Sequence, residues 1–379
     1  MADDARHYRH VVVAPDKFKG SATAAEVGAA LAAGLRAADP ALDVVVLRVA
    51  DGGDGTLDAA VGAGFRRLPV EVSGPVGERV DAAIAVRDDV AVAELAMASG
   101  LVLLPADGLE PLAANSFGTG ELVRAALDQG CTTIVLGVGG SACTDGGAGL
   151  LQALGARFLD SSGADLPLGG GALADLAAVD LSGLDWRLKG VGVVLASDVD
   201  NPLLGPHGAA AVYGPQKGAG PDDVARLEAG LSRLAEAIDR AAADRPGAGA
   251  AGGVGYAAMT VLGATQRPGI DVVLDLINFH ESLLGARLVV TGEGRLDEQT
   301  LHGKAPAGVA AAAVQARVPV VAVSGGRDLD DERLHAAGFA AAYACTDIEP
   351  DVQKCIDDPL PLLERLGRTI AGEQLSSDT

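Results

Sequence analysis

A buried strand that ends in a crowded polar loop is the feature that most constrains the fold of this chain. The apolar run Leu288–Thr291 has the character of a buried β-strand and ends in Gly292-Glu293-Gly294. The loop then supplies a series of chargeable, hydroxyl and amide side chains before a helical run begins at Pro306: Arg295, Asp297, Gln299, Thr300, His302 and Lys304. Ligands bind beside the carboxyl ends of strands in open α/β sheets. The segment therefore predicts part of an active site.

Strand–loop–helix units of the same style occur at both ends of the chain. His10–Ala14 is predicted as a buried strand and Ala22–Ala37 as a helix, with Thr23 and Glu26 at the spacing of a capping box. Leu68–Val92 instead shows short alternating strands typical of an antiparallel sheet. We therefore predict an α/β fold of two domains: a flavodoxin- or Rossmann-like parallel-sheet domain formed by both termini (1–70 and 286–379), and a mixed α/β domain inserted into it (71–285), with the active site in the cleft between them.

The composition excludes several classes of function. The formal net charge is −22, whereas nucleic acids and anionic membranes are bound by basic surfaces, so we expect neither as a partner. The four cysteines do not show zinc-ligand spacing. The chain opens without an apolar signal region and lacks an apolar run long enough to span a membrane, so we expect a cytoplasmic protein. The sequence leaves open whether the protein is a homo-oligomer.

The distribution of lysine indicates a phosphorylated ligand. The chain has six lysines, and four of them lie in Gly/Pro loops: Lys17, Lys19, Lys217 and Lys304. Lysine carries a compact charge that is often used against phosphate, although arginine is the commoner basic residue in this chain. Any one of the four could be a solvent-exposed turn residue. Taken together, they favour a functional role.

Two loops near the N-terminus carry candidate ligand-binding groups. PDKFKGS (15–21) follows a strand and precedes a helix, where backbone N–H groups, Lys19 and Ser21 could hold an anion. It lacks the Walker pattern of a P-loop. In DGGDGT (51–56), Asp51 could contact a metal or a hydroxyl, but a simple turn with an N-cap explains the segment as well.

Further loops in the middle of the chain have a similar character. GVGGSACTDGG (137–147) follows an apolar strand, and its glycines allow the backbone to approach a phosphate or carboxylate closely while Ser141 donates. Thr119 has a comparable loop-to-helix setting, although capping alone could account for it. Asp198 and Asp200 end another strand and form a carboxylate pair that suits Mg²⁺.

Strand-end loops that combine acids, lysines and glycines fit phosphoryl transfer. Cations spread the charge of the phosphates, acids hold Mg²⁺, and one carboxylate orients the attacking hydroxyl. At this level of detail the chain resembles the bacterial glycerate kinases that form 2-phosphoglycerate. The resemblance covers about residues 10–345 and rests on motifs in the family's order: VVVAPDKFKGS, DGGDGT, FGTGEL, GGSACTDGGAG, SDVDNPL, GPQKG, GAGAAGG and TGEGRLDEQTLHGKAP.

The resemblance implies the two-domain fold predicted above, ATP and Mg²⁺ as cosubstrates, and D-glycerate as the phosphoryl acceptor. The residues then expected in the site are Asp297, Asp198 and Lys19 for catalysis; Arg295, Ser141, Asp16 and Ser21 for substrate binding; Lys217, Lys304, Gly139, Gly140 and Thr119 for ATP and its phosphates; and Asp51, Asp200 and Glu293 for the metal. Either Asp297 or Asp198 would orient the glycerate hydroxyl, and Arg295 would clamp the glycerate carboxylate with its bidentate fork.

Three alternatives remain open. A glycerate kinase of this kind could instead form 3-phosphoglycerate, or a related small hydroxy acid could be the acceptor. A non-catalytic sensor of ATP or glycerate is the third alternative, which the dense set of acids and lysines disfavours.

Overall fold

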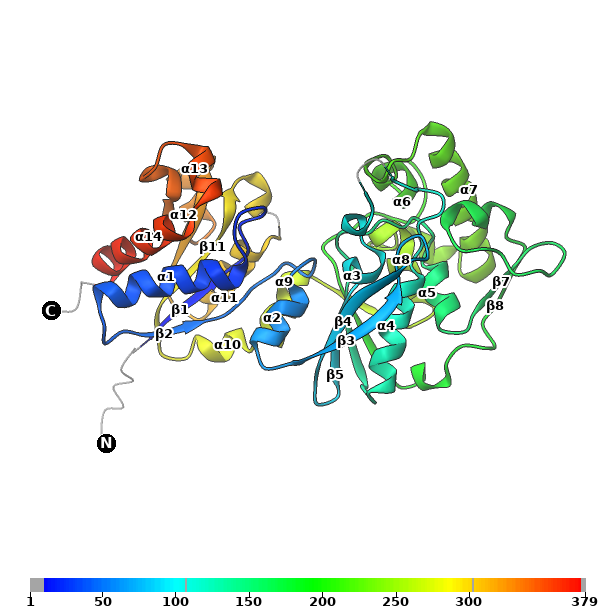
Figure 1. Ribbon diagram of the computed structural model, residues 1–379, viewed down its shortest axis with the longest axis horizontal. Helices are drawn as coiled ribbons and strands as arrows, with labels where there is room; N and C mark the ends of the chain where they lie inside the picture. Colours follow the sequence, from blue (N-terminus) through cyan, green and yellow to red (C-terminus); the bar gives the residue numbers. More distant parts are fainter. Residues whose placement is uncertain (1–9, 106–107, 302, 376–379) are drawn as a thin grey trace. The chain divides into compact units, whose positions relative to one another are not determined.

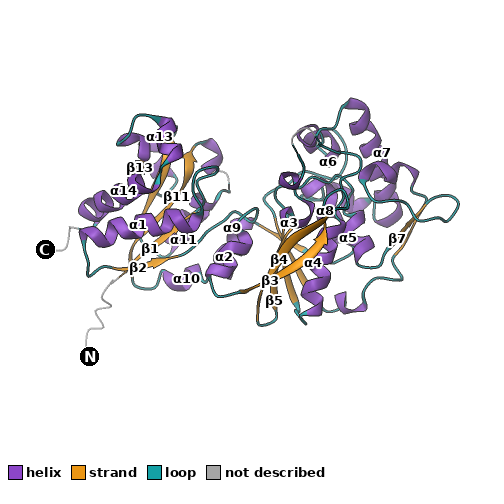
Figure 2. Cartoon of the chain, viewed as in Figure 1, coloured by secondary structure: helices purple, strands orange, loops and turns teal. Residues whose placement is uncertain are grey.

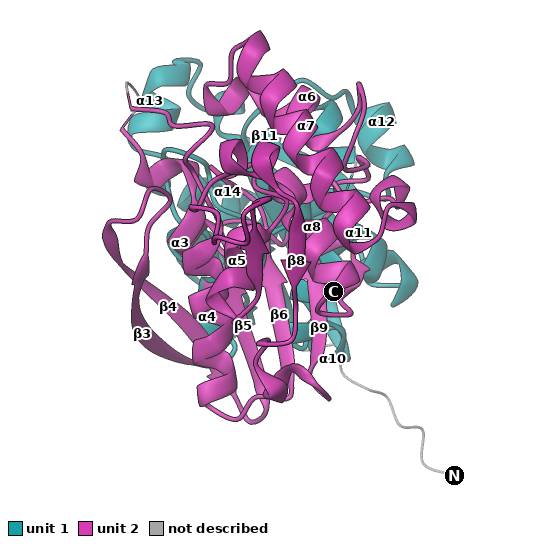
Figure 3. Ribbon diagram, turned by 90° about the vertical axis from the view of Figure 1, so that its right-hand side faces the viewer, with its two compact units in different colours: residues 1–51, 58–63, 270–379 teal, residues 52–57, 64–269 magenta. Residues whose placement is uncertain are grey.

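The computed structural model describes residues 10–105, 108–301 and 303–375 (Figure 1). The chain forms two compact units: unit 1 comprises residues 1–51, 58–63 and 270–379, and unit 2 comprises residues 52–57 and 64–269 (Figure 3). Helices and strands alternate along most of both units (Figure 2), which confirms the predicted α/β fold class. Within the described ranges, no helix has the length and apolar character needed to cross a membrane. The location of the active site between two domains stays a prediction.

Unit 1 is built on a five-stranded sheet of order β13-β12-β11-β1-β2, in which every neighbouring pair is parallel. Its strands are β1 (His10–Pro15), β2 (Asp43–Val46), β11 (Ala286–Leu296), β12 (Val320–Arg327) and β13 (Ala341–Ala344). Val11 to Ala14 of β1 are all fully buried, because helices cover both faces of the sheet. This burial explains why the central strands read as unbroken apolar runs in the sequence.

The helices of unit 1 divide between the two faces of the sheet. Those packed on the face of Val11 and Val13 are α1 (Ala24–Ala38), α13 (Val352–Asp357) and α14 (Leu360–Gln374). Those packed on the face of Val12 and Ala14 are α9 (Gly269–Leu276), α10 (Phe279–Ser282), α11 (Ala305–Gln315) and α12 (Asp331–Ala336), with part of α2 (Thr56–Gly62). Short 3₁₀ turns, η6 (Glu298–Leu301) and η7 (Cys345–Asp347), follow β11 and β13.

Helix α1 begins with the predicted capping box. The Thr23 hydroxyl accepts from the backbone N–H of Glu26, and the Glu26 carboxylate accepts from the N–H of Thr23. Further along, α1 crosses α14 through two glycines. A Cβ on Gly34 would lie 2.0 Å from the Glu364 carbonyl oxygen, and one on Gly367 would lie 2.5 Å from the Leu31 oxygen. Only glycine permits this closeness of the two helices.

Unit 2 contains a six-stranded mixed sheet of order β10-β9-β6-β5-β4-β3. The strands β3 (Arg66–Ser73), β4 (Arg79–Arg87) and β5 (Val90–Glu94) pair antiparallel, whereas β5, β6 (Thr133–Gly137), β9 (Gly192–Ala196) and β10 (Thr265–Arg267) pair parallel. A separate ribbon joins β7 (Arg157–Leu159) to β8 (Ala178–Asp180). The antiparallel character predicted for the region after Leu68 is therefore confirmed for β3 to β5.

The helices of unit 2 pack around the hydrophobic core that includes its six-stranded sheet. They are α3 (Ala96–Ser99), α4 (Phe117–Asp128), α5 (Ala148–Ala153), α6 (Ala209–Tyr213), α7 (Pro221–Ile238) and α8 (Ala250–Thr260), with the 3₁₀ turns η1 (Leu101–Leu103), η2 (Gly170–Asp175), η3 (Trp186–Leu188), η4 (Pro215–Lys217) and η5 (Ala241–Asp244). The loops after the parallel strands β6 and β9 carry most of the predicted ligand-binding residues of this unit.

Candidate active site

The predicted residues are distributed over both units. Unit 1 holds Asp16, Lys19, Ser21, Asp51, Glu293, Arg295, Asp297 and Lys304, and unit 2 holds Thr119, Gly139, Gly140, Ser141, Asp198, Asp200 and Lys217. Each unit therefore holds its own set of candidate groups, and most of them lie in segments that follow parallel strands.

In unit 1, three carboxylates interact at the carboxyl ends of β1 and β11. Pro15 pairs with Gly292 in the parallel register, so Asp16 and Glu293 follow at the same level of the sheet. Burial raises the pKa of Asp16 to about 7; a hydrogen bond from the Lys17 N–H opposes this, and repulsion by Asp51 and Glu293 adds to it. The structure thus brings together Asp16, Asp51 and Glu293, which were predicted from three separate motifs.

Glu293 is the buried centre of a second set of contacts. Its side chain accepts from the Thr300 hydroxyl at 2.6 Å and from the Lys304 ammonium at 3.0 Å, and the residue is only 8% exposed. Burial raises the pKa of Glu293, while the bonds from Thr300 and Lys304 act in the opposite direction. The Lys304 Nζ also lies 3.6 Å from Oδ1 of Asp297. Burial is the largest single influence on Lys304 and lowers its pKa, but the hydrogen bond to Glu293 and the charges of Glu293 and Asp297 together outweigh it, and the net shift of the pKa is upward.

Asp297 shapes the turn that follows β11. Its Oδ1 accepts from the N–H groups of Gln299 at 2.9 Å and Thr300 at 3.3 Å. These bonds orient the carboxylate at the start of η6, next to Lys304. His302, which the sequence placed in the same loop, lies outside the described residues.

Arg295 makes the bidentate contact expected of a carboxylate clamp, but with a residue of its own chain. Its Nε and Nη2 lie 2.7 and 2.6 Å from the two oxygens of Asp328. The guanidinium lowers the pKa of Asp328. Sequence reasoning missed Asp328, because nothing in the segment after β12 marks that residue as the partner of Arg295.

The loop after β1 is anchored by an aromatic side chain. Phe18 is buried, its N–H donates to the Ala22 carbonyl, and it accepts in turn from the N–H of Ser21. The Ser21 hydroxyl donates to the Ile356 carbonyl in α13, so in this structure it is bonded within the chain. Lys19, in contrast, is exposed at the tip of the loop. It is well placed to meet an anion.

In unit 2, the glycines after β6 permit two loops to pack backbone against backbone. A Cβ on Gly139 would lie 2.9 Å from the Cα of Gly53, and one on Gly137 would lie 2.6 Å from the Gly52 oxygen. Gly140 has a φ of +72° and accepts from the N–H of Leu101. The GVGG and DGGDG motifs are therefore parts of one packed structure.

Buried carboxylates hold these two loops in place. Glu94, at the end of β5, accepts from the N–H groups of Gly55 at 3.1 Å and Leu57 at 2.6 Å. Asp145 is fully buried and accepts from the backbone and hydroxyl of Ser116 and from the N–H groups of Gly147 and Gly149. Sequence reasoning missed Glu94; the available signal was an acid at the end of an otherwise apolar strand.

Lys217 is buried beneath the loop after β6. The residue is 2% exposed, and its ammonium donates to the Ser141 hydroxyl oxygen at 2.9 Å and to the Cys143 carbonyl at 2.5 Å. Burial lowers the pKa of Lys217, whereas the nearby Asp145 acts in the opposite direction. Thr119 is also fully buried, and its hydroxyl donates to that of Ser99 at 2.9 Å.

The predicted metal ligands offer carboxylates but do not form a closed cage. Asp198 is exposed and accepts from the N–H of Gly269 at 3.1 Å, and Asp200 is exposed two residues further on. Among the residues with a described placement, no group of three or more His, Cys, Asp or Glu side chains is arranged to hold a metal ion. Mg²⁺ commonly takes one or two carboxylates and completes its shell with water and substrate phosphates. The exposed acids are compatible with that mode of binding.

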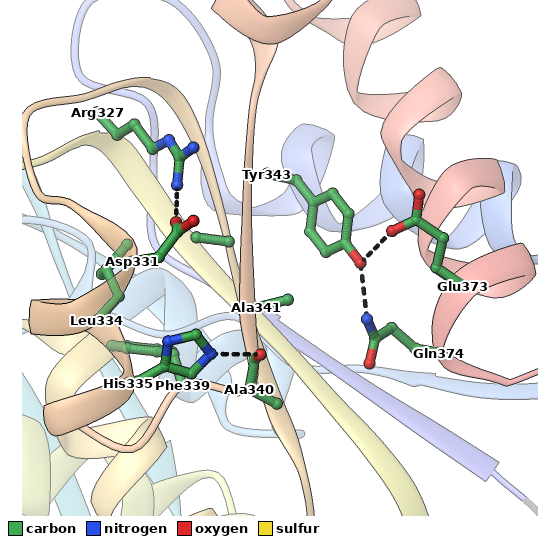
Figure 4. A pocket seen from close by; sticks show the side chains of 11 residues that line it. Arg327, Asp331, Leu334, His335, Phe339, Ala340, Ala341, Tyr343, Glu373 and Gln374 are labelled. Carbon is green, nitrogen blue, oxygen red and sulfur yellow. Dashed lines mark hydrogen bonds and ion pairs between the residues drawn. The ribbon is translucent and has the colours of Figure 1, made fainter.

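A hollow at the edge of the unit 1 sheet is separate from these residues. It has a volume of about 220 Å³ and is lined by residues of α12, β13, α14 and the segment between α12 and β13, together with Arg327 at the end of β12 (Figure 4). None of these residues was predicted for the site. Its polar side chains bond mainly to one another: Arg327 contacts Asp331, and Tyr343 contacts Glu373 and Gln374. These partners leave the hollow few groups with which to recognise a ligand.

The comparisons with known proteins identify the family. The model of the Glycerate kinase family matches residues 11–374. The chain is 44% identical over 368 residues to Glycerate kinase of Bacillus subtilis (strain 168), covering 95% of this chain and 96% of that protein. It is also 44% identical over 342 residues to Glycerate 2-kinase of Escherichia coli (strain K12), covering 88% and 90%.

A solved structure gives the same result. The crystal structure of a protein from Salmonella typhimurium LT2, provisionally described as glycerate kinase 2, matches with a TM-score of 0.84 and 42% identity over 96% of this chain and 97% of that one. The similarity confirms the resemblance that the sequence motifs indicated. The chain therefore belongs to the glycerate kinase family of phosphoryl-transferring enzymes.

Proposed function

We propose that this enzyme transfers the γ-phosphoryl group of ATP to the 2-hydroxyl of D-glycerate and releases 2-phosphoglycerate and ADP, with Mg²⁺ as cosubstrate. The observation that carries this proposal is the 44% identity, over most of both chains, to a protein named Glycerate 2-kinase. In the reaction, the hydroxyl oxygen bonds to the γ-phosphorus while the bond from that phosphorus to the bridging oxygen of ADP breaks. The hydroxyl proton passes to a carboxylate.

The contacts at the end of β11 support phosphoryl transfer in unit 1. Lys304 lies between Glu293 and Asp297 at the start of α11, so a positive charge stands beside two acids and a helix N-terminus. This arrangement supplies a cation for a phosphate and a carboxylate for a hydroxyl proton within one loop. Asp297 is our candidate for the base here, and Asp198 is the alternative from unit 2.

Arg295 is our candidate for binding the glycerate carboxylate. Its guanidinium already holds a carboxylate, that of Asp328, in the two-pronged geometry. Binding of glycerate at Arg295 would then require exchange of one carboxylate for another. Asp16 and Ser21, in the loop after β1, remain candidates for the hydroxyl groups of the substrate.

The nucleotide phosphates are assigned to the exposed Lys19, to Lys304 and to the glycine loop of unit 2. Gly139 and Gly140 allow the loop backbone to lie close to a ligand, since neither carries a side chain. Thr119 is buried against Ser99, so we assign it a supporting role beneath the same loop.

The residues present fit Mg²⁺ by their chemistry. Burial raises the pKa of both Asp16 and Glu293, and neighbouring acids add repulsion at each, so a cation nearby would stabilise their ionised forms. Asp51 and Glu293 in unit 1 and Asp200 in unit 2 are the candidate ligands. When bound, Mg²⁺ would neutralise charge that develops on the transferring phosphoryl group.

An assay with ATP and D-glycerate, coupled to enolase, tests the proposal. Because enolase consumes 2-phosphoglycerate directly, we expect signal without phosphoglycerate mutase. Signal only after the mutase is added would show the 3-phosphate as product. Release of ADP with neither signal would indicate another acceptor chemistry, and absence of ADP release would contradict the proposed function.

A further inference from the structure

The loop after β6 contains a hydroxyl whose hydrogen-bonding role is fixed by a buried charge. Lys217 Nζ lies 2.9 Å from Ser141 Oγ. An ammonium group can only donate, so the Ser141 oxygen must accept. The single hydroxyl hydrogen of Ser141 then points away from Lys217. Among the described residues, none accepts that hydrogen, and Ser141 is partly exposed.

The backbone around Ser141 is fixed independently of its side chain. Ser141 forms an isolated bridge with Gly100, and the N–H of the following residue, Ala142, donates to the Ser99 carbonyl. On the other side, the Cys143 carbonyl accepts from Lys217 at 2.5 Å. The backbone of Gly252 packs closely against that same carbonyl, since a Cβ on Gly252 would lie only 2.1 Å from the oxygen. The direction of the Ser141 hydroxyl is therefore built into the packing.

Thr144 adds a second donor in the same loop. Its residue is 1% exposed, and its hydroxyl oxygen has no hydrogen-bond partner among the residues that the structure describes. Buried hydroxyl groups are normally satisfied, so Thr144 is an exception in the loop that also carries Ser141. The Ser141 hydroxyl, a donor beside a buried cation, suits an anionic oxygen.

We infer that Lys217 is a positioning residue that does not touch the substrates, and that the Ser141 hydroxyl, directed outward by Lys217, binds an anionic oxygen of one of them. The ammonium polarises the hydroxyl and strengthens its donation to an anion. The oxygen belongs either to an ATP phosphate or to the glycerate carboxylate. This inference rests on the proposed function for the identity of the substrates, and it gives Lys217 a different role from the direct phosphate contact that the sequence predicted.

A double-mutant cycle tests the dependence of Ser141 on Lys217. We expect Ser141→Ala to raise the KM of one substrate roughly 10- to 100-fold, the range for a hydrogen bond to a charged group. Separate KM values for ATP and glycerate then show which of them supplies the oxygen. In a Lys217→Met background the same Ser141→Ala change should raise that KM less than about threefold, because the hydroxyl has lost its direction.

An equal Ser141→Ala effect in both backgrounds would overturn the inference, since it would show that Lys217 acts independently. Lys354→Met is the matched control, because the Lys354 side chain is 67% exposed and lies 3.7 Å from its partner, Glu349. It should leave both KM values unchanged.

Amine labelling of the unmodified enzyme provides a second test that does not depend on a variant folding. Mass spectrometry after brief acetylation should show Lys354 modified and Lys217 unmodified, both with and without ATP and glycerate. Labelling of Lys217 that the substrates suppress would show direct contact and overturn the inference. The labelling result tests only the role of Lys217. The proposed function fails separately, if the wild-type enzyme forms no phosphoglycerate from ATP and D-glycerate.

Discussion

The ammonium group of Lys304 lies 3.0 Å from the buried Glu293 carboxylate and 3.6 Å from that of Asp297. One cation and two carboxylates thus meet where β11, the longest strand in unit 1, runs into the loop that follows it. The Lys304 and Glu293 side chains are 28% and 10% exposed, so their pairing is better shielded from water than the surface ion pairs of this chain. This pairing is the structural basis of the first prediction.

Replacement of Lys304 by methionine should lower kcat roughly 100- to 1,000-fold, the size of effect seen when one electrostatic donor to a transition state is removed. The same change should destabilise the protein by about 1–3 kcal/mol, since Glu293 loses its cationic partner. Steady-state kinetics and urea denaturation measure the two effects. Lys354→Met is the control and should change neither, because the Lys354 side chain is 67% exposed and its ion pair is long, at 3.7 Å. A normal kcat for the Lys304→Met variant would show that Lys304 is not part of the active site.

The acid Asp16 should make stability fall as the pH rises in metal-free buffer. Its pKa is about 7 in the folded chain, against an ordinary value of 3.8. Below about pH 3.8 both the folded and unfolded states are protonated, and between the two values only the unfolded state ionises. The contribution of Asp16 to stability is therefore greatest at low pH and declines until about pH 7, by at most about 1.4 kcal/mol per pH unit.

Asp16→Asn removes this effect, because asparagine does not titrate. Urea denaturation should show that the variant gains stability relative to the wild type at pH 8 and gains less, or none, at pH 4. An identical difference at both pH values would contradict the raised pKa of Asp16.

Arg317 occupies a position where glycine would be more stable. It follows the end of α11 with a φ of +58°, and the N–H groups of Arg317 and Val318 donate to Val314 and Ala313, the bonds of a Schellman motif. Because glycine adopts this conformation without steric cost, Arg317→Gly should stabilise the protein by about 1 kcal/mol. Gly285→Ala is the converse control: its φ is +78° and its surroundings are open, so it should destabilise by a similar amount through the backbone alone. If chemical denaturation showed the same free energy of unfolding for Arg317→Gly as for the wild type, it would contradict a backbone strain at Arg317.

Gly252 is constrained by both conformation and space. Its φ is +67°, and an added Cβ would lie 2.1 Å from the Cys143 oxygen and 2.7 Å from the Thr144 Cα. Gly252→Ala should therefore destabilise unit 2 by well over the roughly 1 kcal/mol of the conformational penalty alone. Gly263→Ala is the matched control, because Gly263 has a φ of +66° but no atom within 4 Å of the added Cβ. Equal losses for the two variants in thermal or urea unfolding would show that the close contact at Gly252 is not significant.

The sequence predicted features that depend on neighbouring residues more successfully than those that depend on distant ones. The Thr23–Glu26 capping box follows from a local pattern, as does the polar segment at the end of a buried strand. The predicted end of that strand at Thr291 was wrong, because β11 stays paired with β12 to Leu296 and the loop begins only after it. The bond of Arg295 to Asp328 joins residues 33 apart, and that of Lys217 to Ser141 joins residues 76 apart. Such pairs are set by the sheet register and by loop packing.

Burial was the other property that the sequence could not supply. Lys217 lies in a Gly/Pro loop, which suggested an exposed cation, yet it is 2% exposed, with its ammonium bonded to Ser141 and to the Cys143 carbonyl in the loop after β6. The burial of Glu94 was not predicted, because an acid at the end of a strand can equally face solvent. In both cases the burial of the side chain follows from neighbours supplied by a segment that is distant in the sequence.

The position of the phosphate in the product is the most direct test of the proposed reaction. Proton-coupled ³¹P NMR of the mixture formed from ATP and D-glycerate distinguishes the isomers, because C2 of glycerate carries one hydrogen and C3 carries two. We predict a doublet for the new phosphate ester, as expected for 2-phosphoglycerate. A triplet would establish 3-phosphoglycerate, and it would contradict transfer to the 2-hydroxyl.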